Sequence, residues 1–291
     1  MSVSGSAPSA SIIIAAHNES AVIARCLDAL RPLLDAGSTQ VVVACNGCTD
    51  DTADIARSRR GVTVLELKAA SKVAALRAGD DVAVSGPRIY LDADITMTAR
   101  AARAVLGALG HGAALAARPP IFFDTEGASW AVRRWYLVRG RLPSLRNVLW
   151  GAGTYALSEP GRARFREFPD IVSDDLFIDS LFTEGERIVV PTDPVVVRTP
   201  RRCGDLLKIL RRSYRTQTDV GLARGNVISA GQTSQLRDLL DLLRGDPARV
   251  ADVVIYVTFI GLARISAVFT RFTAPSGTWE RDNSSRIVNT F

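Results

Sequence analysis

The sequence predicts an α/β fold with a mostly parallel central sheet flanked by helices, followed by a C-terminal helical extension. Two patterns predict it. Short β-branched runs alternate with helical patterns as far as residue 117, and long helical patterns replace the strand signals after about residue 200. The chain has 291 residues with 47% hydrophobic content, which suffices for one large domain plus an extension.

The first predicted unit is a strand over 11–16, a polar loop and a helical pattern from Val22 to Leu30. The unit then repeats, with further strands predicted at 40–44, 62–67, 88–92 and 113–117 and with helices at 52–58, up to Leu76, and at 99–109. Apolar strands alternating with helices at this spacing predict a parallel sheet covered on both faces. In such sheets ligands bind beyond the carboxyl ends of the strands.

We expect a domain over 1–200 that binds the ligand and a helical region over 201–291. The helical region would lie close to a second, acceptor substrate or to a membrane. In the segment 206–215, apolar residues and basic residues fall on opposite sides of a helix, which predicts a basic amphipathic helix. The segment 253–269 is apolar except for Arg264, which favours a buried or interfacial helix over a membrane span. These helices either lie on an anionic membrane or pack on the sheet with their arginines in water, and both alternatives stay open.

The composition and the absence of several motifs disfavour some classes of protein function. The net charge is +6, carried mostly by arginine, which suits phosphate groups or anionic membranes but is also explained by genomic base composition. We expect no nucleic-acid partner, because the basic helix lacks interleaved aromatic residues beyond Tyr214. The loop "AAHNES" has no glycine, and no P-loop pattern occurs, which disfavours nucleotidylyltransferases, dinucleotide oxidoreductases and P-loop enzymes. The N-terminus resembles no signal peptide, so we expect a cytoplasmic protein.

Cys45 and Cys48 form a C-x-x-C pattern around Asn46 and Gly47. A second such pair is missing and the chain has only two histidines, which disfavours structural zinc. We interpret this segment as a loop with free thiols, with a redox role as the alternative.

The stretch "RIYLDADITMT" ends a hydrophobic strand with Asp92-Ala93-Asp94. Aspartates at a strand end are also ordinary turn and capping residues. The loops at 17–19 and 45–47 also follow strands, however, so three polar loops are expected at one edge of the sheet. This convergence favours a ligand site.

Several stretches, in this order, resemble the inverting glycosyltransferases of family 2, which have the Rossmann-like GT-A fold. They are "SIIIAAHNES", "VVVACNGCTDDT", "KAASKVAALRAG", "YLDADITMT", "GAGTYALS" and "FPDIVSDDLFI". The resemblance covers roughly residues 10 to 200. It implies transfer of a sugar from a nucleotide-diphosphate sugar, most often a UDP-sugar, to a hydroxyl acceptor.

The resemblance also implies a metal site. Asp94 would bind Mn²⁺ or Mg²⁺, directly or through water, and Asp92 would support the metal or contact the ribose. It implies nucleotide-sugar contacts from the following residues: Ala16, His17, Glu19, Asn46, Lys72, Asp92, Ala93, Arg212 and Arg215.

Some of these positions depart from the family pattern. Asn46 stands where the family commonly has an acid, which leaves the base of the nucleotide open. His17 stands where the family often has tyrosine, and it would either stack on the base or be an ordinary loop histidine. Arg77 stands where the family often has asparagine, so either Lys72 or Arg77 would approach the diphosphate.

The stretch "SDDLFI" supplies the catalytic candidates. Inversion needs a carboxylate that takes the proton of the acceptor hydroxyl. By resemblance to the acidic pair of the family, we expect Asp175 to be the base, with Asp174 beside it. Helix N-terminal capping is the alternative role for both.

The acceptor is not specified by these patterns. We expect a lipid-linked or cell-envelope glycan precursor and a peripheral location at the inner face of the plasma membrane. A soluble natural product is one alternative. A catalytically inactive fold that serves as a membrane-docking or assembly module is another. The segment 122–150, with Trp130, Trp135 and Trp150, is a candidate for acceptor selection.

Overall fold

The computed structural model describes residues 9–171, 173–224 and 230–271, without the side chains of 215–234 and 268–271. The chain divides into two compact units. The first comprises Met1–Phe122, Leu149–Asp170 and Phe177–Val197, and the second comprises Phe123–Val148, Ile171–Leu176 and Arg198–Phe291. The units are thus interleaved along the chain, whereas the domains predicted from sequence divide at residue 200.

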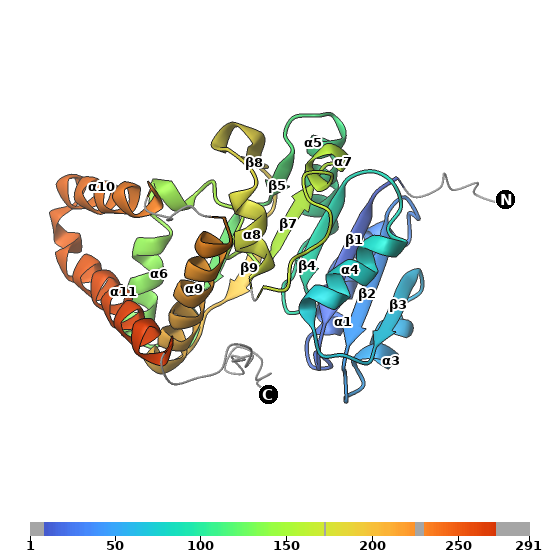
Figure 1. Cartoon of the computed structure of the whole chain (residues 1–291), viewed down its shortest axis with the longest axis horizontal. Helices are drawn as coiled ribbons and strands as arrows, with labels where there is room; N and C mark the ends of the chain where they lie inside the picture. Colours follow the sequence, from blue (N-terminus) through green and yellow to red (C-terminus); the bar gives the residue numbers. More distant parts are fainter. Residues whose placement is uncertain (1–8, 172, 225–229, 272–291) are drawn as a thin grey trace. The chain divides into compact units, whose positions relative to one another are not determined.

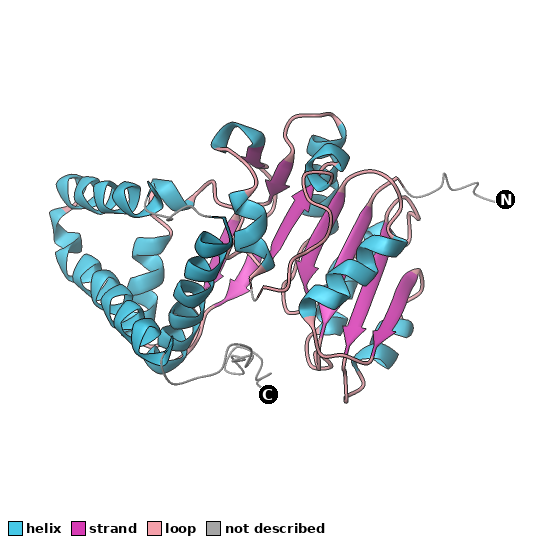
Figure 2. Cartoon of the chain, in the orientation of Figure 1, coloured by secondary structure: helices cyan, strands magenta, loops and turns pink. Residues whose placement is uncertain are grey.

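The first unit is built on a seven-stranded sheet (Figures 1 and 2). Its strands, in spatial order, are β3 (Val62–Leu67), β2 (Gln40–Asn46), β1 (Ser11–Ala16), β4 (Arg88–Asp92), β7 (Thr154–Leu157), β5 (Ala116–Arg118) and β8 (Arg187–Val189). The first four are mutually parallel, β7 is antiparallel to both of its neighbours, and β5 and β8 are parallel. The predicted fold class, a mostly parallel sheet flanked by helices, is therefore confirmed.

The remaining elements of this part of the chain connect these strands. They are α1 (Ile23–Ala29), α2 (Arg31–Leu34), α3 (Thr52–Arg57), α4 (Lys72–Val82), α5 (Ala99–Gly110), α7 (Glu159–Arg162), α8 (Asp174–Ser180) and η2 (Glu184–Glu186). β6 (Ile121–Asp124) and β9 (Val195–Arg198) pair as a separate two-stranded sheet. Side chains cap several of the helix starts; for example, Ser71 Oγ accepts from Ala74 N at 3.2 Å, and Thr98 Oγ1 accepts from Ala101 N at 3.1 Å.

The core lies on both faces of the sheet because successive residues of a strand point to opposite sides. Ile12 and Ile14 of β1 pack in one cluster with residues of α1, α3 and α5. Ile13 packs in a second cluster with Val73 and Leu76 of α4. Figure 1 shows α4 lying over the sheet near β1. Burial on both faces explains why the central strands β1 and β2 are nearly continuous apolar runs.

The predicted strand at 113–117 is wrong at its start, because β5 begins at Ala116. The helix before it, α5, continues to Gly110, and Gly112 then adopts a left-handed conformation with φ of +73°. The Ala113 amide donates to the carbonyl of Ala108, so the residues before the strand complete a helix-ending turn.

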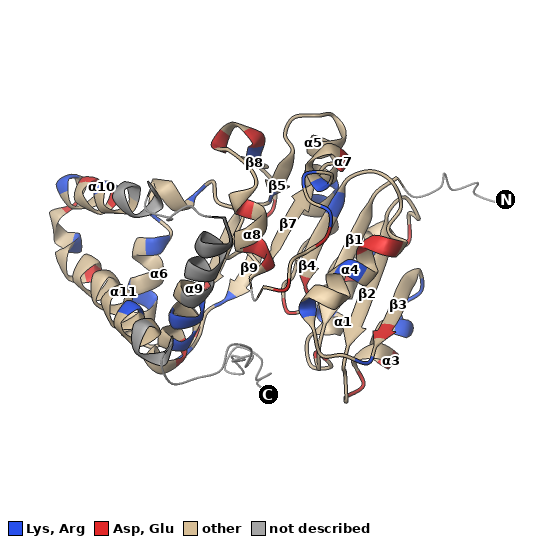
Figure 3. Cartoon of the chain, in the orientation of Figure 1, with Lys and Arg blue, Asp and Glu red and all other residues tan. Residues whose placement is uncertain are grey.

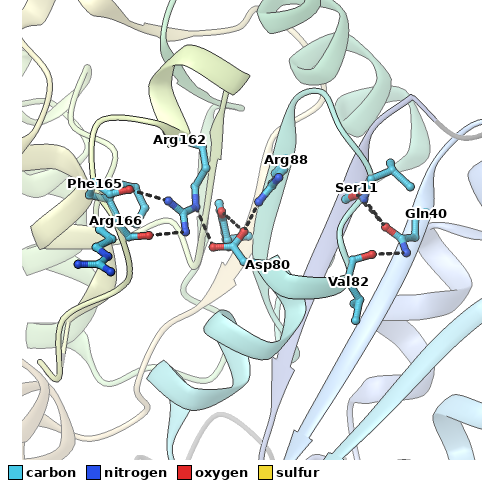
Figure 4. Close-up of polar contacts among 10 residues, drawn as sticks. Ser11, Gln40, Asp80, Val82, Arg88, Arg162, Phe165 and Arg166 are labelled. Atoms are coloured by element: carbon cyan, nitrogen blue, oxygen red, sulfur yellow. Dashed lines mark hydrogen bonds and ion pairs between the residues drawn. The ribbon is translucent and has the colours of Figure 1, made fainter.

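A buried carboxylate joins three elements of the first unit (Figure 4). Asp80 of α4 accepts from Arg88 Nη1 and Tyr90 Oη, both at 2.7 Å, and from Arg162 Nε at 2.8 Å. Burial first, and then Asp80, raise the pKa of Tyr90 well above its ordinary value, so the phenol stays a hydrogen-bond donor. The cluster ties α4 to β4 and α7.

The second unit contains four longer helices. They are α6 (Trp130–Arg139), α9 (Cys203–Arg224), α10 (Ala230–Gly245) and α11 (Val250–Arg271), with the short turns η1 (Pro143–Leu145) and η3 (Pro247–Arg249). Trp135 of α6 stacks on Tyr256 of α11 with ring centroids 5.3 Å apart, and both rings are buried. Asp252 pairs with Arg249 at 3.1 Å and with Arg134 at 3.5 Å. Trp135 thus fills the core, which leaves Trp130, half exposed, as the accessible tryptophan of α6.

The two predicted C-terminal helices lie within α9 and α11. Leu206 and Leu210 of α9 are buried and Lys208 is exposed, but Arg211 and Arg212 are only partly exposed. The described residues contain one helix, Pro247–Ala267, long and apolar enough to cross a membrane by length and composition, and 33% of its apolar window is buried. Figure 3 shows that the ribbon of α11 is largely uncharged.

Candidate active site

The candidate site begins where β1, β2 and β4 end. The strand register places Ala16 beside Cys45 and Ala15 beside Asp92. Because the three strands are parallel and adjacent, the loops that follow them leave the sheet at the same edge. The structure therefore brings together the three polar loops that the sequence analysis singled out.

Hydrogen bonds of Asn46 connect the loop after β1 with the loop after β2. Asn46 is buried, and its Nδ2 donates to the carbonyl of Ala16 at 2.9 Å. His17 Nδ1 lies 2.5 Å from the carbonyl oxygen of Asn46. Glu19 is also buried, and its backbone amide donates to Thr52 Oγ1 at 2.7 Å. These contacts fix the shape of the two loops, so Asn46 and His17 each have a structural task.

A third contact between these loops depends on Asn18, whose φ of +52° is in the left-handed region. This conformation directs Asn18 Oδ1 to accept from the amide of Thr49 at 2.7 Å. Asparagine tolerates this region better than most residues. The loop geometry thus explains an asparagine at this position without reference to a ligand.

At the end of β4, Asp92 pairs with Lys72. Lys72 Nζ lies 2.7 Å from Asp92 Oδ1, and Lys72 is the first residue of α4. The amide of Ile95 donates to the carbonyl of Asp92 at 3.1 Å, which turns the chain through Ala93 and Asp94. Ala93, between the two aspartates, is buried. This corner therefore brings the Lys72 ammonium next to the carboxylate of Asp92, with Asp94 two residues further on.

The residues at this corner fit a divalent cation shared with a diphosphate. In the described part of the chain no group of three or more His, Cys, Asp or Glu residues forms a closed metal cage. Mg²⁺ and Mn²⁺ often take only one or two protein carboxylates, with phosphate oxygens and water completing the shell. Asp94, half-buried, and Asp92 are suitable donors for such an open site.

Asp174 and Asp175 occupy the first turn of α8. Asp174 is buried, and Asp175 is half-buried with its Oδ1 accepting from the amide of Leu176 at 2.8 Å. Both aspartates belong to the second compact unit, as does Arg212 on α9. The predicted role of Arg215 concerns a side chain that lies outside the described ones.

Arg77 is engaged away from the strand ends. Its Nε donates to the carbonyl of Phe168 at 2.8 Å, and its guanidinium pairs with Asp170 at 3.1 Å. Of the two cations considered for the diphosphate, Lys72 is therefore the one beside Asp92.

Sequence reasoning missed Arg25 and Asp50. Arg25 Nη2 donates to the carbonyl of Asp94 at 3.2 Å. Asp50 accepts from the amides of Ser20 at 3.2 Å and Thr52 at 3.1 Å. Burial favours a higher pKa for Asp50, but the hydrogen bonds outweigh it and the pKa is lowered. The pattern Asp-x-Thr before a helix could have identified Asp50, whereas nothing local marks Arg25.

Comparisons with known proteins identify the family and the fold. A family model described as glycosyl transferase family 2 matches residues 11–168, which is more than half of the chain. No curated protein sequence matches the chain.

Two solved structures show the likeness in fold. A mannosyltransferase from Pyrobaculum calidifontis, in complex with GDP-Man and Mn²⁺, is 16% identical with a TM-score of 0.64, covering 92% of this chain and 88% of that one. A glucosyl-3-phosphoglycerate synthase from Mycobacterium tuberculosis, in complex with Mn²⁺, UDP-Glc and phosphoglyceric acid, is 18% identical with a TM-score of 0.56, covering 76% and 82%. The protein belongs to glycosyl transferase family 2 and is a glycosyltransferase with the GT-A fold.

Proposed function

We propose that this protein is a metal-dependent, inverting glycosyltransferase that moves a sugar from a nucleotide-diphosphate sugar to an acceptor hydroxyl. The observation that supports this most is the corner at the end of β4, where Lys72 lies 2.7 Å from Asp92 and Asp94 follows in the same turn. The loops after β1 and β2, which are connected by hydrogen bonds, leave the sheet at the same edge. Together they suit a nucleotide beside a diphosphate.

Charge explains the residue types at this corner. Negative charge grows on the diphosphate as the bond to the sugar breaks, and the Lys72 ammonium would stabilise it. When bound, Mn²⁺ or Mg²⁺ would supply further positive charge to the departing diphosphate, held by Asp94 with Asp92. Related structures contain Mn²⁺ with GDP-Man or UDP-Glc, and Mg²⁺ with UDP.

We assign nucleotide contacts to the first two loops. The backbone of Ala16 and Ala93 and the side chains of His17, Glu19 and Asn46 are the candidates, with Arg212 and Arg215 as further phosphate contacts. The side-chain Nδ2 of Asn46 already donates to the carbonyl of Ala16. The side-chain Oδ1 of Asn46 is therefore the atom that would accept from a base. We favour a UDP-sugar as donor, and a GDP-sugar is the alternative.

The proton of the acceptor hydroxyl would pass to Asp175. Its Oδ1 accepts a hydrogen bond from the amide of Leu176, which helps to orient the carboxylate. Asp174, which is buried, would act as a positioning residue beside it.

For the acceptor we favour a lipid-linked or cell-envelope glycan precursor, handled by a cytoplasmic protein peripheral to the plasma membrane. The support is the row of exposed apolar side chains on α11, which includes Val254, Val257 and Ile265. A soluble acceptor is the alternative. It is supported by the phosphoglyceric acid bound in the Mycobacterium tuberculosis synthase.

A donor screen tests the proposal. Release of nucleoside diphosphate from UDP-, GDP- and dTDP-sugars is followed with Mn²⁺, Mg²⁺ or EDTA, for the wild type and for Asp94→Asn and Asp175→Asn. We expect one donor to be hydrolysed slowly, EDTA to abolish turnover, and each substitution to lower it about 100-fold or more. Asp81→Asn, at an exposed site on α4, is the matched control and should keep full activity.

Donor binding by calorimetry is measured in parallel, because some transferases turn over only with their acceptor. A turnover rate that is changed neither by EDTA nor by the two substitutions would overturn the site assignment. Absence of binding by every donor with either metal would favour an inactive docking module instead.

A further inference from the structure

The end of β2 and the loop after it carry two cysteines that the proposed reaction does not use. Cys45 lies within β2 and pairs with Ala16 in the strand register, and Cys48 follows three residues later. Between them Gly47 has φ of +59°, and a Cβ there would lie 2.9 Å from the amide nitrogen of Ala70. This tight turn, which favours glycine, folds Cys48 back toward Cys45. Both cysteines are free thiols.

The two thiols are neighbours in space. Cys45 is 2% exposed, and Cys48 packs against the same hydrophobic cluster while remaining partly exposed. Burial first, and then the charge of Cys48 and a hydrogen bond with its thiol, raise the pKa of Cys45 to about 12. An incoming reagent therefore meets Cys48 first, with Cys45 directly behind it.

Cys48 also holds the two nucleotide loops together. Its thiol donates to the carbonyl of Ala16 at 3.5 Å, and its sulfur accepts from the amide of Asn18 at 3.4 Å. The carbonyl of Ala16 is the same group that accepts from Asn46. The state of one sulfur atom is thus coupled to the backbone of both loops.

We propose that Cys45 and Cys48 form a reversible disulfide in the presence of peroxide, and that the disulfide weakens nucleotide binding at the neighbouring loops. The regulatory half of this inference rests on the proposed function. The formation of the bond itself does not.

The chemistry balances with hydrogen peroxide as oxidant. The Cys48 thiolate attacks one peroxide oxygen, the O–O bond breaks, and water leaves after proton uptake, giving a sulfenic acid on Cys48. The sulfur of Cys45 then attacks the Cys48 sulfur, the S–S bond forms, the S–O bond breaks, and a second water leaves with the Cys45 proton. Two thiols lose two electrons, and one peroxide becomes two waters. A dithiol reductant reverses the change by exchange.

The disulfide would change the loops in two ways. A disulfide sulfur carries no hydrogen, so the donation to the carbonyl of Ala16 is lost. The Cys48 sulfur would also move toward Cys45 and away from the amide of Asn18. Two weak contacts between the loops then disappear, and we expect nucleotide affinity to fall about tenfold.

The bond is tested by mass on the full-length protein. After hydrogen peroxide treatment and alkylation of remaining thiols, we expect loss of two hydrogens and a peptide crosslink between Cys45 and Cys48, both reversed by dithiothreitol. The Cys203→Ala variant, altered in the other unit, should oxidise in the same way. Peroxide-treated protein in which both cysteines are fully alkylated would overturn the proposal.

The effect is tested by calorimetric titration with UDP and with GDP, each with Mn²⁺, on reduced, oxidised and re-reduced protein. We expect about tenfold weaker binding only in the oxidised sample. Cys45→Ala, or Cys45→Ser if the first variant does not fold, should bind as the reduced wild type does before peroxide is added, and peroxide should produce no crosslink to Cys48 in it. Equal affinities of reduced and disulfide-bonded protein would overturn the regulatory half. If the reduced protein binds neither nucleotide, both the proposed function and the regulatory half of this inference are overturned. Formation of the disulfide is still decided by the mass measurement alone.

Discussion

At the scale of single residues, Gly153 controls the space beside Asp92. It lies just before β7 with φ of +63°, and its carbonyl accepts from the amide of Asp92 at 2.8 Å. A Cβ at this position would lie 2.4 Å from Ile95 Cγ1 and 3.4 Å from Asp92 Oδ2. Any larger residue would therefore push on the turn that carries Asp92 and Asp94.

We predict that Gly153→Ala lowers the free energy of unfolding by about 1–3 kcal/mol, because it adds both backbone strain and overlap with Ile95. Metal-dependent donor binding should weaken as well. Denaturant unfolding and calorimetry measure the two effects. Gly107→Ala is the matched control, since no atom lies within 4 Å of its Cβ and alanine in the helix α5 should stabilise by about 0.5–1 kcal/mol. Equal stability of both variants would show that the turn yields freely.

The residues at this corner differ in how well the sequence predicts them. Asp92 and Asn46 end apolar strands and Asp94 follows one, so the pattern of the chain predicts their position at the edge of the sheet. The contact of Arg25 with the carbonyl of Asp94 joins residues 69 positions apart and depends on how α1 packs. No local pattern encodes a contact of this kind.

At the scale of elements, α4 and β4 are joined at both of their ends. Lys72 pairs with Asp92 at one end, and Asp80 binds Arg88 and Tyr90 at the other. The two elements should therefore move together. The Asp80 cluster anchors the start of β4 to α4, at the end of the strand opposite Asp92.

We predict that Asp80→Asn costs about 3 kcal/mol of unfolding free energy, because it leaves the partly buried guanidinium groups of Arg88 and Arg162 without their carboxylate. Chemical denaturation measures the change. The control is Asp81→Asn, one residue along α4 and exposed, for which we expect a change within about 0.5 kcal/mol. Similar values for the two variants would mean that the cluster contributes little to stability.

The turn η2 gives the first unit a contribution to stability that depends on pH. A hydrogen bond from Arg164, followed by those from Thr183, lowers the pKa of Glu186 from 4.5 to about 2. A carboxyl with a lower pKa in the folded state stabilises the fold above pH 4.5, and this contribution disappears as the pH falls toward 2. We therefore predict that Glu186→Gln is less stable than the wild type at neutral pH and that the difference shrinks below pH 4.5. Unfolding curves between pH 2 and 7 measure it, and a difference independent of pH would contradict the assignment.

Elements were predictable in proportion to their length and burial. β1, β3 and β4 coincide with their predicted ranges because each has five or six residues and is rich in apolar side chains. β5 and β8 have three residues each, too few for any periodicity, and they pair only because β7 and the tertiary fold bring them together. The interleaving of the two units depends on similarly long-range contacts, which lie beyond local sequence patterns.

At the scale of the whole molecule, the exposed apolar residues are concentrated in the last helices. On α11, Val250, Val254, Val257, Leu262 and Ile265 are each about half exposed. They recur at intervals of three to five residues, as expected for one side of a helix. A soluble chain gains nothing from exposing such a row, whereas a lipid surface would bury it.

We predict that the full-length protein co-sediments with vesicles containing anionic phospholipid. Each charge placed in the row, as in Val254→Glu or Val257→Glu, should weaken partitioning about tenfold, because it removes buried apolar area and adds a like charge facing the lipid. Val82→Glu is the matched control: it adds the same charge at an exposed valine at the end of α4, and partitioning should stay unchanged. Light scattering without lipid distinguishes the alternative, in which α11 packs against a second copy. A wild type that is dimeric, becomes monomeric with Val254→Glu and ignores vesicles would replace the lipid with a partner subunit. If Val254→Glu, Val257→Glu and the Val82→Glu control bind vesicles equally, the row on α11 is not the membrane contact. The basic residues of α9 would then be the next candidate.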